Sequence, residues 1–433
     1  MPRLGLLIPE FPTQTHIAMW RLGRAIARTG VEVEMLSTRR PEGEAAVHPA
    51  LAEEAGRTFY CWPARPGSLL NEGLRAWARL PAALWYATTL REGSLRERMR
   101  VGGMVLPALA LKRRCRERRL GHVFVHSCAS AAHLAALCRI LGGPAYSLRL
   151  GGDIGVYGVN QAGKMRRATV VVGAARVNME QVLARTRVPR QRAIWSWLGV
   201  ETAKYRPGTH VPDAKRPMRV VTVARLNHAK GHRFVLDAMA LALTKGVEMH
   251  WTIVGDGPER AAIVRQARSL ELEQRVELTG SLDEEGVRAT LQMAEVFVLP
   301  TSGPGEGSPV AVLEAMSAGL AIVASDVGGL REMVGDEQGV IVPAGDSGAL
   351  SEALVGLARD PQRRAAMARS SRERALREFD VDAVARRLVG YFFPKHQVVA
   401  QAAEGDVESD GTGFVGRTSG GRHAPLERAH DAA

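Results

Sequence analysis

The chain has 433 residues, of which 46% are hydrophobic and 24% are charged. This length predicts two large domains, and abundant glycine with few aromatic residues favours an α/β protein over an all-β one. The net charge of +13 suits nucleic acid, a phosphorylated ligand or an acidic membrane surface, and equally a solvated arginine-rich surface. The four cysteines lack a metal-binding spacing, and no stretch reaches the ~20 uncharged apolar residues that span a bilayer.

The first half of the chain begins in the order strand, loop, helix, strand. Residues 4–8 form an apolar run typical of a buried strand. A Pro-containing loop, a helix over 17–28 and a second strand over 31–36 follow. This order is the opening of a doubly wound domain. Further strands are predicted at 122–126, 145–150 and 169–172.

Residues 65–120 are predicted to form arginine-rich helices, with Trp77, Trp85 and Tyr86 interleaved. Basic residues far outnumber acidic ones in this stretch. A basic amphipathic helix can lie on an anionic membrane, but the same pattern fits a solvated helical face. The sequence leaves both interpretations open.

A second alternating unit follows a polar, Pro-containing segment at 199–217, which is the predicted domain boundary. Strands that alternate with helices at this spacing indicate a parallel sheet. Residues 397–433 are polar, Gly-rich and aperiodic, and we predict a disordered tail there. The strands of the second unit are predicted at 219–223, 249–254, 276–278, 296–299 and 320–324, with helices at 234–243 and 259–269.

The densest functional pattern covers residues 301–329. After a strand, a Gly-rich loop contains Glu306, and Ser308 and Pro309 suit the N-cap and the first position of a helix. Glu314 then lies about one and a half turns into that helix. The free amides at the helix start form an anion site that suits a phosphate. The two carboxylates therefore suit hydroxyl groups of a sugar or ribose.

Two cations are positioned to neutralise the phosphates of such a ligand. Arg225 follows the predicted strand at 219–223, and Lys230 precedes Gly231 before the next helix. Ligands of open α/β sheets bind at the carboxyl ends of the strands. We therefore expect Arg225 and Lys230 to stabilise a diphosphate that becomes a leaving group.

With these motifs the sequence resembles the retaining family 4 glycosyltransferases of the GT-B fold. The resemblance extends over residues 1–394 and is strongest over 219–350. The N-terminal loop with Phe11-Pro12-Thr13-Gln14-Thr15 is similar to that of the exopolysaccharide branch, of the colanic-acid type. The resemblance implies two Rossmann-like β/α/β domains that face a central cleft. It rests on Ala224-Arg225-Leu226 with Lys230-Gly231, on Val254-Gly255-Asp256-Gly257-Pro258, and on the run from Glu306 to Met316.

The resemblance also implies roles for the charged residues. Arg225, Lys230 and Glu306 would be the catalytic residues, with the two cations on the donor diphosphate and Glu306 on hydroxyls of the donor sugar. Glu314 would hold the nucleotide ribose.

Backbone groups would complete the donor site. The amides of Gly307, Ser308 and Val310 would contact the anion, because Pro309 has no N–H to donate. The loop near Thr279-Gly280-Ser281 would meet the base.

One position departs from the family pattern. The segment from Tyr146 to Asp153 is similar to a family strand that ends in a His before Gly-Asp, and here that position is Gly151. The family His faces the donor sugar across the cleft. Its absence implies weakened transfer, or substitution by Arg149, Asp153 or His126.

Four residues are candidates for the acceptor side: Thr15, His16, His126 and Asp153. The two histidines suit structural or acceptor-side packing better than a role as catalytic base. Asp153 fits a helix cap as well as a site residue.

We predict no metal and no cofactor beyond the nucleotide sugar. Asp380-Val381-Asp382 spells a D-x-D metal motif, but Asp380 directly precedes an apolar-periodic helix and suits its N-cap. Cations of the protein would do the work of a divalent ion. Asp256 is expected to form a turn rather than to act in catalysis.

The predicted activity is transfer of a hexose from a nucleotide-diphosphate sugar to a saccharide or lipid-linked acceptor, with retention of configuration (EC 2.4), in exopolysaccharide or cell-surface glycan synthesis. One alternative is a non-catalytic GT-B homologue that acts as a binding or scaffold subunit. Another is a sugar-nucleotide epimerase. An NAD-dependent oxidoreductase is disfavoured because no Gly-x-Gly-x-x-Gly follows the first strand. Nucleic-acid binding has only the net charge in its favour.

The expected organisation is an acceptor-side domain at 1–207, a nucleotide-sugar domain at 218–378, a helix within 379–396 that crosses back to the first domain, and the tail at 397–433. The cysteine pattern suits a reducing cytoplasm, and the apolar run at 4–8 is too short for a secretory signal. Peripheral contact with the anionic inner face of the cytoplasmic membrane is a further hypothesis.

Overall fold

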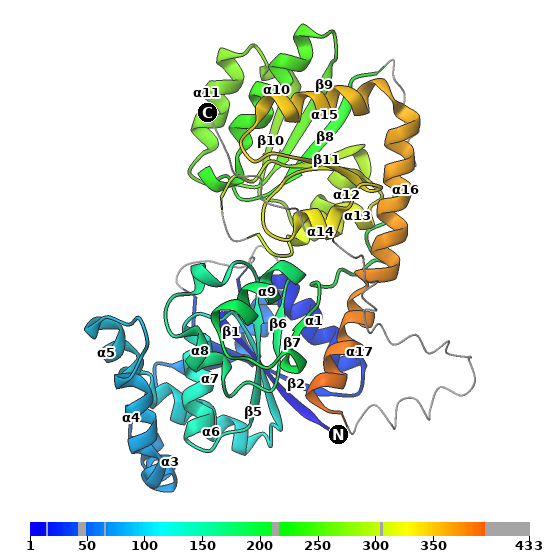
Figure 1. Ribbon diagram of the computed structural model, residues 1–433. Helices are drawn as coiled ribbons and strands as arrows, with labels where there is room; N and C mark the ends of the chain where they lie inside the picture. Colours follow the sequence, from blue (N-terminus) through cyan, green and yellow to red (C-terminus); the bar gives the residue numbers. More distant parts are fainter. Residues whose placement is uncertain (14–15, 42–48, 65, 210–215, 304–305, 395–433) are drawn as a thin grey trace, which may run out of the picture.

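The computed structural model describes residues 1–13, 16–41, 49–64, 66–209, 216–303 and 306–394. Thr15 and the segment 397–433 lie outside the described residues. The chain forms two parallel sheets, each covered by helices (Figure 1), and the two halves meet at the carboxyl ends of the strands.

The N-terminal sheet has seven strands in the order β3-β2-β1-β4-β5-β6-β7, and every neighbouring pair is parallel. The strands are β1 (Arg3–Glu10), β2 (Glu32–Arg39), β3 (Phe59–Trp62), β4 (His122–His126), β5 (Ala145–Leu150), β6 (Val171–Gly173) and β7 (Ala193–Trp195). The helices of this half are α1 (Ile17–Arg28), α2 (Pro49–Arg57), α3 (Leu70–Ala76), α4 (Leu80–Thr88), α5 (Leu95–Gly103), α6 (Val105–Glu117), α7 (Ser130–Ile140), α8 (Gln161–Met165) and α9 (Arg176–Arg185).

The C-terminal sheet has six parallel strands in the order β10-β9-β8-β11-β12-β13. The strands are β8 (Met218–Val223), β9 (Met249–Val254), β10 (Val276–Gly280), β11 (Val296–Leu299), β12 (Ala321–Ser325) and β13 (Gly339–Val342). The helices are α10 (His232–Thr244), α11 (Arg260–Ser269), α12 (Glu284–Met293), α13 (Val310–Ser317), α14 (Leu330–Val334), α15 (Ser347–Arg359), α16 (Pro361–Glu378) and α17 (Val381–Phe392).

Both sheets are buried on two faces, as parallel sheets covered by helices must be. In β1, Leu4, Leu6 and Ile8 belong to one hydrophobic cluster and Leu7 belongs to the other, in keeping with the two-residue period of a strand. The predicted α/β class with two Rossmann-like units is therefore confirmed.

Two segments connect the halves, and they lie side by side. The N–H of Val200 donates to the carbonyl of Phe379 (2.8 Å), and the N–H of Val381 donates to the carbonyl of Val200 (3.0 Å). The chain thus passes to the C-terminal half after β7 and returns at the junction of α16 and α17 (Figure 1).

Helix α17 packs against α1 of the N-terminal half. Arg28 of α1 donates from Nε to Asp382 of α17 (2.8 Å), and Phe392 stacks on His122 of β4 with ring centroids 5.0 Å apart. Asp380 caps the helix, because its Oδ1 accepts the N–H groups of Asp382 and Ala383 (both 3.1 Å). The predicted N-cap is confirmed, so this carboxylate serves the helix start.

Helices α3, α4 and α5 project from the N-terminal half, on the side opposite α17 (Figure 1). The base of this projection is held by the buried carboxylate of Glu72, which accepts hydrogen bonds from Lys112 (3.1 Å) and Arg116 (2.9 Å) of α6. Burial would raise the pKa of Glu72, but these two cations lower it overall. Part of the basic charge in residues 65–120 is therefore neutralised inside the fold.

Candidate functional site

A cavity of about 450 Å³ lies between the two halves. Ile17, Ala18 and Arg21 of α1 line it from the N-terminal half. The opposite wall is formed at the carboxyl ends of β8 and β9 and at the start of α13, which is where ligands of open α/β sheets bind. The residues of that wall include Arg225, Gly255, Asp256, Ser281, Asp283, Glu284, Val310 and Glu314.

Arg225 is exposed at the cavity because the turns after β8 and β9 hold its backbone in place. The N–H of Leu226 donates to the carbonyl of Asp256 (2.9 Å), and Asp256 Oδ1 accepts the N–H of Gly257 (2.7 Å). Gly255 has a φ of 141°, and a Cβ there would lie 2.0 Å from the carbonyl oxygen of Ala224. The predicted turn role of Asp256 is confirmed, and only glycine fits at Gly255.

Helix α13 begins one residue later than predicted. Its N-cap is Pro309, which makes no side-chain cap bond, whereas Ser308 was the predicted cap. Ser308 Oγ instead accepts the N–H of Leu198 from the segment that joins the halves (3.3 Å). The prediction was wrong because a tertiary contact, which local sequence does not encode, takes up this hydroxyl.

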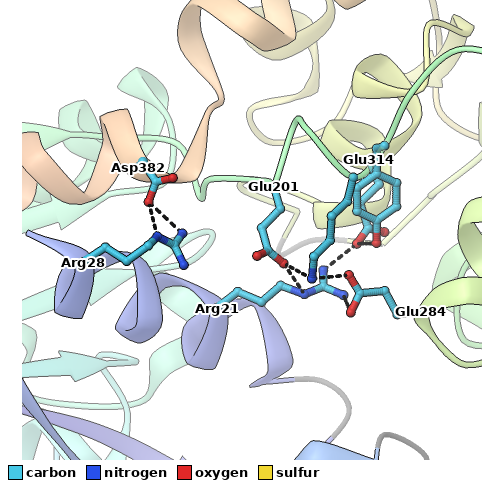
Figure 2. Close-up of polar contacts among 8 residues, drawn as sticks. Arg21, Arg28, Glu201, Glu284, Glu314 and Asp382 are labelled. Carbon is cyan, nitrogen blue, oxygen red and sulfur yellow. Dashed lines mark hydrogen bonds and ion pairs between the residues drawn. The ribbon is translucent and has the colours of Figure 1, made fainter.

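Glu314 is buried in α13 and is held by two residues from outside the helix. Arg21 of α1 donates from Nη1 to Glu314 Oε1 (2.8 Å), and the hydroxyl of Tyr205 donates to the same oxygen (2.7 Å). Figure 2 shows the guanidinium of Arg21 reaching from the N-terminal half to this carboxylate. Because both contacts use Oε1, Oε2 of the same carboxylate is the oxygen that a ligand in the cavity would approach.

Arg21 lies at the centre of a charged cluster that bridges the halves. Its guanidinium also lies 3.3 Å from Glu284 and 3.8 Å from Glu201, and Lys204 pairs with both of these carboxylates (Figure 2). Burial works to lower the pKa of Arg21, but Glu314 and Glu284 raise it above its ordinary value. Arg21 therefore stays charged, and three carboxylates share the positive charge of two cations.

Lys230 and Glu306 lie outside the lining of the cavity and form an ion pair with each other. Thr301 Oγ1 also lies 3.4 Å from Glu306 Oε1. Both side chains are partly buried, and each comes from a loop at the carboxyl edge of the C-terminal sheet. The structure thus brings together two residues that the sequence places 76 positions apart.

The loop after Glu306 makes a close contact across the cleft. A Cβ on Gly307 would lie 2.2 Å from the carbonyl oxygen of Gly151 and 2.8 Å from Cβ of Ala174. Both neighbours belong to the N-terminal half, so Gly307 has no side chain because the halves approach each other there. Among the described atoms, a Cβ on Gly151 would come within 4 Å of the hydroxyl of Tyr157 alone, at 3.1 Å.

The described acceptor-side candidates lie at the carboxyl edge of the N-terminal sheet. His16 Nδ1 is 2.8 Å from the carbonyl oxygen of Glu10 and 2.7 Å from Thr13 Oγ1, so this ring organises the loop after β1. The ring of His126 packs edge-on against that of His16 with centroids 5.4 Å apart. Burial lowers the pKa of both histidines, and in His16 this outweighs the raising effect of Glu10.

Asp153 lies just before a short 3-10 turn but makes no side-chain cap bond to it. Its Oδ1 accepts from Gln181 Nε2 of α9 (2.9 Å), and Gln181 Oε1 in turn accepts the N–H of Ile154 (3.0 Å). Asp153 therefore anchors the loop after β5 to α9. The role of Thr15 stays a prediction, since the residue lies outside the described part of the chain.

Sequence reasoning missed Arg21, Tyr205 and Glu284. Arg21 carried a signal, because it lies in α1 beside Ala18, Leu22 and Ala25, which are buried. A charged residue next to the apolar stripe of a helix needs a buried partner. That partner, Glu314, is 293 positions away in the sequence.

Comparison with known proteins agrees with this architecture. Residues 211–374 match the family model described as glycosyl transferases group 1. The match covers the C-terminal sheet and most of α16, and it includes Arg225, Lys230, Glu306 and Glu314.

Two relatives are bacterial glycosyltransferases of polysaccharide synthesis. WcaL of Escherichia coli K12, assigned to colanic acid biosynthesis, is 31% identical over 206 residues, which cover 46% of this chain and 50% of that protein. The amylovoran biosynthesis glycosyltransferase AmsK of Erwinia amylovora is 31% identical over 175 residues, covering 39% and 42%. The chain spans about half the length of the curated relatives it matches.

Solved structures match over nearly the whole chain. Sucrose-phosphate synthase of Thermosynechococcus elongatus gives a TM-score of 0.68 at 18% identity and covers 93% of this chain and 100% of its own. Anabaena HepE in complex with UDP gives 0.68 at 15% identity and covers 90% and 98%. The chain therefore has the GT-B fold, as the sequence resemblance implied.

Proposed function

We propose that this chain transfers a hexose from a nucleotide-diphosphate sugar to a saccharide or lipid-linked acceptor. The proposal starts from the match of residues 211–374 to the group 1 glycosyl transferases. The observation that carries the proposal is the cavity between the halves, with Arg225 and Glu314 in its wall and the Lys230–Glu306 pair in the adjoining loops. The UDP and UDP-glucose complexes of HepE support a nucleotide sugar as donor. WcaL and AmsK favour a role in exopolysaccharide synthesis.

In this proposal, the cations bind the diphosphate of the donor and the carboxylates bind its hydroxyl groups. Arg225 and Lys230 bind the diphosphate, and Glu306, released from Lys230, binds hydroxyls of the hexose. Glu314 Oε2 binds the ribose while Oε1 stays with Arg21 and Tyr205. The amides of Gly307, Ser308 and Val310 at the start of α13 add donors for the diphosphate.

We propose retention of configuration, as in the retaining family 4 enzymes. The bond between the anomeric carbon and the phosphate oxygen breaks, and its electrons pass to the diphosphate. The acceptor hydroxyl forms the new bond on the same face and gives its proton to the departing diphosphate. Arg225 and Lys230 stabilise the charge that develops on the leaving group, and contact between the halves excludes water from the oxocarbenium-like centre.

A donor screen tests the proposal. The full chain is incubated with common UDP- and GDP-hexoses, with and without candidate acceptors, and released nucleoside diphosphate is measured. We expect release with one class of donor and a product whose anomeric configuration, by NMR, equals that of the donor. Inverted product would refute retention, and epimerised donor without acceptor would indicate an epimerase instead.

A non-catalytic binding subunit is the second candidate, and Gly151 favours it. The His of the family pattern is missing here, and a Cβ at this residue would already lie 3.1 Å from the hydroxyl of Tyr157. Donor turnover by the wild-type chain contradicts this candidate. An inactive wild type that gains turnover through Gly151→His supports it.

We also propose that α3, α4 and α5 bind an anionic membrane surface. Half of the large apolar side chains that are exposed in the described part of the chain fall within residues 62–106, among them Leu74, Trp77 and Trp85 at 70–72% exposure. A cavity of about 430 Å³ beside Trp85 is lined by arginines, which suits an anionic headgroup: Arg91, Arg166, Arg167 and Arg187. Among the described residues, no helix has the length and apolar character to cross a bilayer. Exposed aromatic residues with basic neighbours are typical of interfacial binding.

Vesicle sedimentation measures this contact. Replacing Leu74, Trp77 and Trp85 by serine together is expected to lower binding to vesicles containing phosphatidylglycerol by at least ~10-fold, since each side chain loses apolar area buried at the interface. Met293→Ser with Leu376→Ser, at exposed apolar sites of the C-terminal half, is the matched control and should bind like the wild type. Equal binding by the triple variant and this control would refute the proposal.

A further inference from the structure

Arg149 is a fully buried arginine whose guanidinium makes no hydrogen bond within the described part of the chain. It lies in β5, one residue before the strand ends, and its side chain has no exposed area. Among the residues that the structure describes, none forms a hydrogen bond with its Nε, Nη1 or Nη2. Burying a charge without a partner is strongly unfavourable. An anionic ligand that accepts hydrogen bonds from the guanidinium would remove this cost.

Among the described residues, the other buried Arg and Lys side chains each have hydrogen-bond partners within the fold, although Nε of Arg21 and Nε of Arg364 have none. Arg364 donates to Glu295 (3.1 Å) and to the carbonyl of Leu357. Lys164, which also lies in the N-terminal half, donates to the carbonyls of Cys128 (2.6 Å) and Tyr157 (3.0 Å). Arg149 therefore differs from these side chains, because none of its three guanidinium nitrogens has a hydrogen-bond partner among the described residues.

The two described side chains that interact with Arg149, those of His126 and Tyr157, supply no negative charge. His126, its register partner on β4, is a neutral ring whose pKa burial, His16 and Arg149 itself all lower, and its Nδ1 is buried without a partner. Burial raises the pKa of Tyr157 to about 12, so its hydroxyl is neutral. Burial lowers the pKa of Arg149 to about 10, which leaves the guanidinium protonated at neutral pH.

The position of Arg149 connects it to the cleft. Two residues further on, the carbonyl of Gly151 meets Gly307, the residue after Glu306. The donor-side cations Arg225 and Lys230 belong to the other half, so an anion at Arg149 lies on the acceptor side of this contact.

We propose that Arg149, with His126 beside it, binds an oxyanion carried by the acceptor, either a sugar carboxylate or a phosphate. That the ligand is the acceptor rests on the proposed function, whereas the anion site itself rests on the buried guanidinium of Arg149 alone. A planar guanidinium binds either group through two parallel hydrogen bonds. The anion enters when the halves part at Gly151 and Gly307, and it holds the acceptor next to the donor hexose.

Thermal unfolding of the full chain tests the site without relying on transfer. The background variant is Lys230→Ala, which weakens anion binding on the donor side. The probes are glucuronate, with glucose as its uncharged match, and glycerol phosphate, with glycerol as its match. We expect an anionic probe at high concentration to raise Tm by roughly 2–4 °C while its neutral match does not. The stronger of the two anions identifies a carboxylate or a phosphate.

Adding Arg149→Met should abolish the rise, and Arg149→Lys should keep part of it. Without any probe, Arg149→Met should raise Tm, because an unpaired buried charge is removed. An equal rise with glucuronate and glucose in the Lys230→Ala chain overturns the proposal even if Arg149→Met fails to fold. So does a rise that persists in Arg149→Met.

Kinetics then separate this site from the proposed function. In an active enzyme, Arg149→Met should raise KM for an anionic acceptor by about 10–100-fold and leave KM for the donor within a few-fold. A change confined to the donor KM would overturn the acceptor assignment. A chain that binds the anion through Arg149 but turns over no nucleotide sugar would refute the proposed function and leave the anion site standing.

Discussion

Replacing Lys230 by alanine is expected to lower the rate of hexosyl transfer by about 10²–10³-fold, as for the loss of one donor aimed at developing charge. In the structure Lys230 pairs with Glu306 in the C-terminal half. A bound diphosphate competes with that carboxylate for the cation, and the cation then stabilises the leaving group. The rate should fall in kcat more than in KM, because the charge is largest in the transition state.

The same substitution should leave the fold intact. An ion pair that retains contact with solvent contributes little to stability, so Tm should stay within a few degrees of the wild type. Lys245→Ala is the matched control, since Lys245 pairs with Glu352 on the surface of the C-terminal half, and it should keep full activity. If Lys230→Ala and Glu306→Ala both transferred hexose at the wild-type rate, the donor site would be assigned to the wrong residues.

Replacing Gly307 by alanine should lower kcat/KM by about 100-fold, a loss comparable to a misplacement of 1 Å at a reacting centre. The new methyl group would lie 2.2 Å from the carbonyl oxygen of Gly151, far inside van der Waals contact. Because that neighbour belongs to the other half, the strain is relieved by moving the halves apart. Steady-state kinetics measure the loss, and small-angle scattering measures the wider separation.

Binding of free nucleoside diphosphate should persist in Gly307→Ala, since Arg225 and Glu314 are untouched by the change. Gly356→Ala provides the control, because a Cβ in that part of α15 meets no atom closer than 3.9 Å. Unchanged kinetics in Gly307→Ala would contradict a requirement for close contact between the halves.

The sequence predicted the elements that carry a strong periodic pattern. Strands β4, β5, β9 and β11 and helix α1 have the predicted bounds, because each is a run of buried residues or a clear apolar stripe. Strands β3, β7 and β13 were missed. They are as short as β11, but β11 is a run of four buried apolar residues, whereas these three strands are only partly buried and provide little pattern.

For the candidate site, local motifs could likewise be read from the sequence, whereas contacts between distant segments could not. Candidates could be named where a local motif follows a strand, and their roles stay predictions: Arg225, Lys230, Glu306 and Glu314. Contacts between the halves could not be found. The ion pair between Arg21 and Glu314 depends on how the two sheets face each other, and no local spacing in the sequence encodes that arrangement.

The pairing of Val200 with Phe379 and Val381 has a practical consequence for dissecting the protein. Because the last described helix, α17, covers α1, a fragment that ends near residue 208 exposes the apolar surface that Phe392 and Leu388 cover in the full chain. The N-terminal half is therefore assembled from two distant stretches of the gene. Expressing the N-terminal half alone requires a fusion that joins the stretch ending near residue 208 to α17. Chimaeras with other chains of this fold should exchange that stretch and α17 together.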